Sequence, residues 1–197
     1  MKAVQEKTSA DDLPRLVNDE GVDPDTFRSI MGALPTGVAV VTGYDRDGIP
    51  RGLTCSAVCS VSMTPPLLLV CVDKRNRTLE ALRDSGGFVV NFLRAESAHV
   101  SQTFASRSPD KFSSVAWRRS PTTGLPWLYD DSLAFADCRL AREIEAGDHT
   151  ILLGSIVDGG GPVEGCGPLM YWQRCYGAWP VGDSDESALV TVAATGS

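Results

Sequence analysis

The run Val38-Ala39-Val40-Val41-Thr42 leads into Asp45-Arg46-Asp47-Gly48, and an extended stretch follows from Arg51 to Ser62. β-Branched residues dominate the first run, which predicts a strand. The Asp- and Gly-rich tetrapeptide is typical of a turn. The two segments and their connection together predict a β-hairpin.

Further strands are expected on the C-terminal side of this hairpin, at 67–72, 87–93, 132–145 and 150–157. The last two are joined by a turn at 146–149, and short helices are predicted at 78–83 and 96–105. With about six strands and few helices, the pattern favours a closed or partly closed antiparallel barrel over a βαβ sheet. The irregular stretch 106–131 is long, and long loops in compact domains are often functional.

The two ends of the chain differ in composition from the middle. Residues 1–24 are mainly polar and acidic, which predicts an N-terminal arm, and 181–197 predict a tail. Asp23 and Pro24 form a helix start, followed at helical spacing by apolar Phe27, Ile30 and Leu34. The packed domain is therefore expected over 25–180.

Composition limits the classes of function. The 197 residues are 43% hydrophobic and 22% charged, with a net charge of −7, as in one globular domain with an acidic surface. Such a charge disfavours nucleic acid and anionic membranes as partners. The apolar run 67–72 is far shorter than the roughly 20 residues of a membrane span. Six cysteines without a CxxC pair, and an N-terminus without a secretory signal, predict reduced thiols in the cytoplasm.

Motifs for protein-based catalysis are absent from the sequence. It contains no GxSxG, HExxH, Walker A or GxGxxG pattern and only two histidines, so a metal centre is not expected. If the protein is an enzyme, its chemistry is expected to come from an organic cofactor.

Two segments offer groups that bind such a cofactor. The stretch from Gly52 to Ser62 carries several hydroxyls among small residues, which suits the binding of a phosphate or a ribityl chain. The alternative is a Ser/Thr-rich edge strand that binds no ligand. Lys74-Arg75-Asn76-Arg77-Thr78 places cations at the start of a short helix, where anions are favoured. Its alternative is a solvated charge cluster.

Seven short motifs occur together in a recognisable order. They are Leu34-Pro35-Thr36-Gly37-Val38, Gly52 to Ser62 with Pro65-Pro66-Leu67, Val89-Val90-Asn91-Phe92-Leu93, Phe104-Ala105, Asp110-Lys111-Phe112, Gly147-Asp148-His149 and Pro168-Leu169-Met170-Tyr171. Over about residues 25–180 the set resembles the flavin reductase-like family, the reductase components of two-component flavin-dependent monooxygenases.

The resemblance implies a mostly β fold, the FMN-binding split β-barrel with a few short flanking helices. It also implies a homodimer whose flavin lies in a groove near the subunit interface. The residues implied to lie along the flavin ring and ribityl chain are Thr54, Cys55, Ser56 and Ala57, with Thr36 as a further candidate. Those implied to meet phosphate are Ser60, Val61, Ser62, Arg75, Asn76 and Arg77, and those towards the adenosine half of FAD are Phe104, Ala105 and Lys111.

The nicotinamide side is implied by two other segments. From sequence alone a histidine in a turn is usually solvated, but in the resembled family the Gly-Asp-His turn faces the nicotinamide nucleotide. His149 is therefore expected to position NADH. The wall on the same side would be Met170, Tyr171, Trp172, Gln173 and Arg174, for which the alternative is an aromatic core cluster.

The implied activity is NAD(P)H:flavin oxidoreductase, which reduces FAD or FMN by hydride transfer and releases reduced flavin to a partner monooxygenase by diffusion. Lys111 and the long loop favour FAD over FMN, and the lack of an obvious basic pocket for a 2′-phosphate favours NADH over NADPH. Two alternatives stay open: a non-catalytic flavin- or haem-binding module of the same barrel type, and a flavin-bound oxidase with its own substrate.

Overall fold

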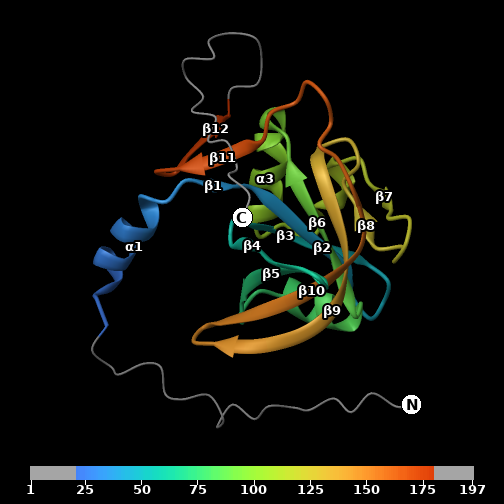
Figure 1. Cartoon of the computed structure of the whole chain (residues 1–197), viewed down its shortest axis with the longest axis horizontal. Helices are drawn as coiled ribbons and strands as arrows, with labels where there is room; N and C mark the ends of the chain where they lie inside the picture. The colour runs from blue at the N-terminus through green and yellow to red at the C-terminus, as the bar shows by residue number, and fades with distance from the viewer. Residues whose placement is uncertain (1–20, 180–197) are drawn as a thin grey trace.

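The structure is a computed structural model that describes residues 21–179. Its main elements, labelled in Figure 1, are helices α1 (Pro24–Gly32), α2 (Thr78–Asp84) and α3 (Ala98–Ala105) and strands β1 (Thr36–Gly37), β2 (Ala39–Tyr44), β3 (Pro50–Cys55), β4 (Val58–Met63), β5 (Pro66–Asp73), β6 (Gly87–Leu93), β7 (Arg118–Arg119), β8 (Pro126–Trp127), β9 (Ser132–Ala146), β10 (His149–Gly160), β11 (Leu169–Trp172) and β12 (Cys175–Ala178). Two 3₁₀ turns, η2 (Ala95–Ser97) and η3 (Phe112–Ser114), flank these helices. The predicted arm (1–24) and tail (181–197) lie almost wholly outside the described residues.

The main sheet is antiparallel and has the strand order β3-β2-β6-β9-β10-β5-β4. Its two edge strands, β3 and β4, are consecutive in the chain, so the bend at Ser56 and Ala57 brings the edges together. The N–H of Cys71 in β5 donates to the carbonyl of Ala57 at 3.0 Å, which extends the β4–β5 pairing up to this bend. The expected mostly β, partly closed antiparallel barrel is thus confirmed.

The predicted hairpin is only half correct. β2 pairs with β3 in the expected way, with Val40 opposite Thr54. The second half of the extended stretch leaves this pair, and β4 pairs with β5 instead. The sequence shows that both segments are extended, but the choice of neighbour is made by closure of the barrel.

Side-chain alternation along β2 divides the interior into two cores. Ala39 and Val41 point into the barrel, where they join buried residues such as Phe88 and Leu152. Val38 and Val40 point the other way, into a second core formed with α3 and β11. This second core holds α3 against the outside of the barrel, and α3 forms one wall of the site described below.

A buried polar network ties the long loop to the barrel. The Asn91 amide donates to the Val40 carbonyl at 2.9 Å, and its oxygen accepts from the Leu128 N–H at 2.8 Å. Thr42 Oγ1 donates to the Pro126 carbonyl at 2.5 Å. The stretch 106–131, expected to be irregular, therefore folds back as η3 and the β7–β8 pair in a fixed position.

Helix α1 begins as predicted at Asp23, whose Oδ1 accepts from the N–H groups of Asp25 and Thr26 at 2.9 and 3.0 Å. It buries none of its residues. In Figure 1 it stands apart from the barrel, connected through β1 to the small sheet β1-β11-β12. Within the described residues, no helix combines the length and the apolar character needed to cross a membrane.

Candidate active site

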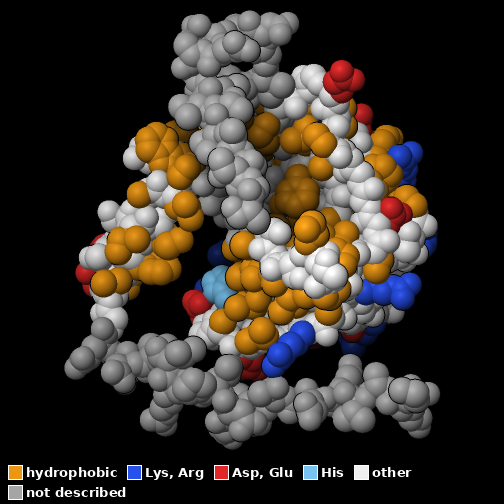
Figure 2. All heavy atoms as spheres, in the orientation of Figure 1, with side chains coloured by type: hydrophobic (Ala, Val, Ile, Leu, Met, Phe, Trp, Pro, Cys, Tyr) orange, Lys and Arg blue, Asp and Glu red, His pale blue; other side chains and the backbone are white. Residues whose placement is uncertain are grey.

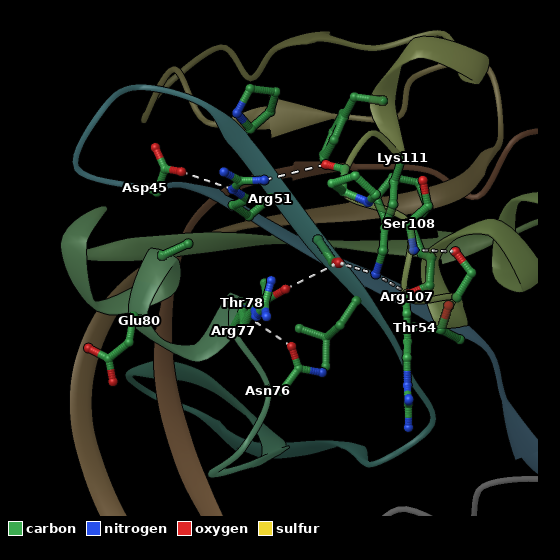
Figure 3. Close-up of a pocket in the computed structure, with 18 of the residues that line it drawn as sticks. Asp45, Arg51, Thr54, Asn76, Arg77, Thr78, Glu80, Arg107, Ser108 and Lys111 are labelled. Carbon is green, nitrogen blue, oxygen red and sulfur yellow. Dashed lines mark hydrogen bonds and ion pairs between the residues drawn. The ribbon is translucent and has the colours of Figure 1, made fainter.

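A groove of about 1100 Å³ opens between β3, the segment leading into α2, and the loop between α3 and η3 (Figure 3). β3 contributes Arg51 to Thr54 to its wall. The α2 side contributes the segment from Arg75 to Thr78, and the opposite side contributes residues between Phe104 and Phe112. Its size suits a large organic ligand.

The carbonyl oxygen of Gly52 holds the two walls together. It accepts from Thr78 Oγ1 and from Lys111 Nζ, both at 3.2 Å. The same Nζ donates to the Phe104 carbonyl at 2.7 Å. A side chain at position 52 would not fit, because an added Cβ would lie 2.6 Å from the Phe104 ring.

Two arginines of the groove are committed to carboxylates. Arg51 Nε lies 2.9 Å from Asp45, and Arg75 Nη2 lies 2.7 Å from Asp73. Hydrogen bonds from Arg75 hold the pKa of the Asp73 carboxyl well below its usual range. Arg77 and Arg107 also line the groove, and neither has an ion-pair partner among the described residues. The groove therefore keeps positive charge available for an anionic ligand.

Seven of the predicted residues come together in this groove: Thr54, Arg75, Asn76, Arg77, Phe104, Ala105 and Lys111. Besides Arg75, Thr54 and Lys111 are engaged within the protein. Thr54 Oγ1 donates to the Ser101 carbonyl at 2.6 Å, and the Lys111 ammonium contacts the two carbonyls named above. Burial lowers the pKa of Lys111. Its clearest role in the structure is to brace the groove.

The remaining residues of the hydroxyl-rich segment lie outside the groove. Ser56 and Ala57 form the exposed bend after β3, and Ser60, Val61 and Ser62 lie on the edge strand β4. The side chain of Cys55 is buried in the barrel core, with Sγ 3.6 Å from the Cys71 carbonyl. Only its backbone can face a ligand.

His149 begins β10, directly opposite Asp73 in β5. Its Nδ1 lies 2.7 Å from Oδ1 of Asp148. Asp73 in turn binds Arg75, so the histidine is connected to the cationic side of the groove through one strand pair. The side chain is partly exposed, and it does not line the groove described above.

Thr36 and the segment 170–174 share the small sheet. Thr36 pairs with Tyr171, and the Tyr171 ring packs against Tyr176 at 5.3 Å between centroids. Gln173 and Arg174 form the tip of the β11–β12 hairpin with φ of 47° and 64°. None of these residues lines the groove described above.

Groove residues that the sequence reasoning missed include Arg51 of β3 and Arg107 and Ser108 of the long loop. The available signal for the two loop residues is the length of the stretch 106–131, which is typical of a functional loop but does not single out residues. Within residues 21–179, no three His, Cys, Asp or Glu side chains are grouped to hold a metal ion.

Comparison with known proteins identifies this arrangement. The family model described as flavin reductase like domain matches residues 31–180, well over half of the chain. The chain belongs to the flavin reductase-like family. The split-barrel fold implied by the sequence motifs is thereby confirmed.

The relatives of this flavin reductase-like chain include proteins of several bacteria. It is 51% identical to a flavin reductase (NADH) of Kitasatospora aureofaciens over 89% of this chain and 92% of the relative. It is 39% identical to the flavin-dependent monooxygenase reductase subunit HsaB of Mycobacterium tuberculosis, over 68% and 71% of the two chains. The NADH:FAD oxidoreductase SgcE6 of Streptomyces globisporus, solved with NAD and FAD fragments, has a TM-score of 0.75 at 32% identity, covering 84% of this chain and 99% of SgcE6.

Proposed function

We propose that this protein is a homodimeric NADH:FAD oxidoreductase that releases reduced FAD for a separate monooxygenase. As a flavin reductase it oxidises NAD(P)H and supplies reduced flavin to a monooxygenase partner. The choice of FAD and of NADH is the finer part of the proposal. The choice of FAD rests on the groove of about 1100 Å³, which is lined by Arg77 and Arg107, the two arginines without an ion-pair partner named above.

The residues of the chain bind and align two substrates. Hydride passes from C4 of the nicotinamide to N5 of the flavin, which needs no side-chain acid or base in that step. The protein supplies proximity by holding both rings against one surface. We assign the flavin ring to the segment from Thr54 to Ala57, its phosphate to the Asn76 and Arg77 side of the groove, and the nicotinamide to His149.

The choice of NADH rests on the relatives of the chain. It is 51% identical to a flavin reductase (NADH) and 40% identical to a flavin reductase (NADPH). The higher identity to the NADH enzyme supports NADH as the preferred nucleotide.

The homodimer follows from helix α1. Phe27, Ile30 and Met31 lie on one face of the helix, Leu34 follows just after its end, and each is about half exposed. Figure 2 shows hydrophobic side chains along α1 and further ones on the neighbouring face of the barrel. A helix of nine residues is not stable by itself in water, so this face needs a partner surface. A second copy of the chain, covering both α1 and the exposed edge strand β4, supplies it.

Transfer by diffusion follows from the kind of binding surface. The groove is open and holds no Gly-rich dinucleotide loop, so we expect micromolar affinity for flavin, about −8 kcal/mol.

All six cysteines are unpaired, in keeping with a reducing cytoplasmic location.

Steady-state kinetics with FAD, FMN and riboflavin tests the proposal. NADH oxidation should depend on added flavin and be most efficient with FAD. A membrane permeable to flavin but not to protein then separates the reductase and NADH from an oxygenase. Product on the oxygenase side supports diffusive transfer, whereas activity only on direct mixing would contradict it.

A further inference from the structure

The loop 106–111 between α3 and η3 forms one wall of the groove and is held by its own hydrogen bonds. Ser106 Oγ donates to the Thr103 carbonyl at 2.7 Å and accepts from the Ser108 N–H at 3.2 Å. Arg51 Nη1 donates to the Pro109 carbonyl at 3.4 Å. The backbone on both sides of Arg107 is therefore fixed at the rim of the groove.

Lys111 closes this loop and is not available to a ligand. Its ammonium donates to two backbone carbonyls, one on β3 and one at the end of α3. Moving Nζ to a phosphate would leave both carbonyls without this donor, at a cost comparable with the new contact. The positive charge on this wall must come from another residue.

Arg107 is that residue. It is exposed, it lines the groove, and it has no hydrogen-bond or ion-pair partner among the described residues. Figure 3 shows it on the same side as Ser108 and Lys111, across the groove from Arg77 and Asn76. Arg46 is less suitable, because Asp47 and Asp84 line the same end of the groove and offset its charge.

Two arginines on opposite walls match a ligand with two linked phosphates. Arg guanidinium groups bind phosphate through paired N–H donors, and a single phosphate held at Arg77 leaves Arg107 without an anion. We infer that Arg107 is a specificity-determining residue that binds the pyrophosphate of FAD and so selects FAD over FMN. This inference rests on the proposed function and names the residue that gives the enzyme its flavin preference. NADH carries the same pyrophosphate, so the test must separate the two dinucleotides.

The test uses the full chain and the variants Arg107→Ala, Arg77→Ala and Arg139→Ala. Arg139 is an exposed residue of β9 that does not line the groove, and it serves as the matched control. Dissociation constants for FAD and for FMN are measured by flavin fluorescence without NADH. The KM for NADH is then measured with FMN as the acceptor.

We expect Arg107→Ala to raise the dissociation constant of FAD about tenfold and that of FMN less than twofold, since one charge-assisted contact is lost. Arg77→Ala should weaken both flavins, and Arg139→Ala neither. Arg107→Lys should restore part of the FAD affinity. Equal effects of Arg107→Ala on FAD and FMN would overturn the inference, as would an increase confined to the KM for NADH. Flavin binding with this pattern but without NADH oxidation would contradict the proposed function and leave the role of Arg107 standing.

Discussion

Oδ1 of Asp148 lies 2.7 Å from Nδ1 of His149 at the start of β10. This contact favours the histidine tautomer with its proton on Nδ1, because the carboxylate accepts from that nitrogen. Nε2 then presents a lone pair to a ligand. The contact with His149 lowers the pKa of the Asp148 carboxyl, so the carboxylate is ionised at neutral pH and can accept from Nδ1–H.

His149→Ala should raise the KM for NADH by about 2- to 150-fold, the range for one lost hydrogen bond, with a smaller effect on flavin binding. Asp148→Asn should have little effect, because the amide oxygen still accepts from Nδ1–H, whereas Asp148→Leu should resemble His149→Ala in direction. The measurements are KM values for NADH and flavin dissociation constants. An increase in the flavin dissociation constant with an unchanged KM for NADH would show that His149 is wrongly assigned.

Gly52→Ala should destabilise the barrel by about 1–3 kcal/mol, the usual cost of overpacking. The added Cβ would lie 2.6 Å from the Phe104 ring, and Phe104 is buried beneath the groove. Urea unfolding measures the loss. Gly177→Ala is the matched control, because nothing lies within 4 Å of its added Cβ. Equal stability of the two variants would mean that the Phe104 ring yields without cost.

Ile30→Asp should convert a dimer into a monomer, because it places a charge in the apolar face of α1. Ser29→Asp adds the same charge on the opposite face of the helix and should leave the dimer intact. Sedimentation equilibrium distinguishes the states. A native protein that sediments at its chain mass of 21.0 kDa would contradict the proposed role of α1.

The buried thiols predict a pH dependence. Burial raises the pKa of Cys55 to about 11 and that of Cys138 to about 12, from 9.0. From about pH 9.0 up to these raised pKa values, the unfolded chain loses thiol protons that the native state keeps. These two thiols should therefore lower the free energy of unfolding as the pH rises through that window.

At about pH 8, iodoacetamide should label the exposed Cys59 and Cys175 well before Cys55 and Cys138. Mass spectrometry of the labelled peptides checks the order, and early labelling of Cys138 would contradict it.

The sequence predicts the local elements well because their signals are local. The cap at Asp23 and the β-branched run at 38–42 need no distant partner, and both form as expected. The pairing of β4 with β5, instead of a continuation of the hairpin strand β3, was not predictable, because strand pairing depends on closure of the whole sheet. The turn between β11 and β12 at Gln173 and Arg174 was also not predictable, because both residues adopt left-handed φ angles although neither is a glycine.

The candidate site was predicted in part for the same reason. Arg75, Asn76 and Arg77 follow a predicted strand directly, so their clustering is visible in the sequence. Arg107 belongs to a loop whose path is set by contacts with residues far along the chain, such as the bond from Arg51 Nη1 to the Pro109 carbonyl at 3.4 Å. Its place at the groove becomes apparent only in the folded chain.

Anaerobic rapid mixing shows directly whether this chain passes hydride from NADH to bound FAD. Purified protein with FAD is mixed with NADH, and the oxidised-flavin absorbance is followed in the absence of oxygen. We expect complete bleaching with one NADH consumed per FAD, at a rate far above that of the same mixture without protein. A folded sample that binds FAD but leaves it oxidised would contradict the proposed hydride transfer.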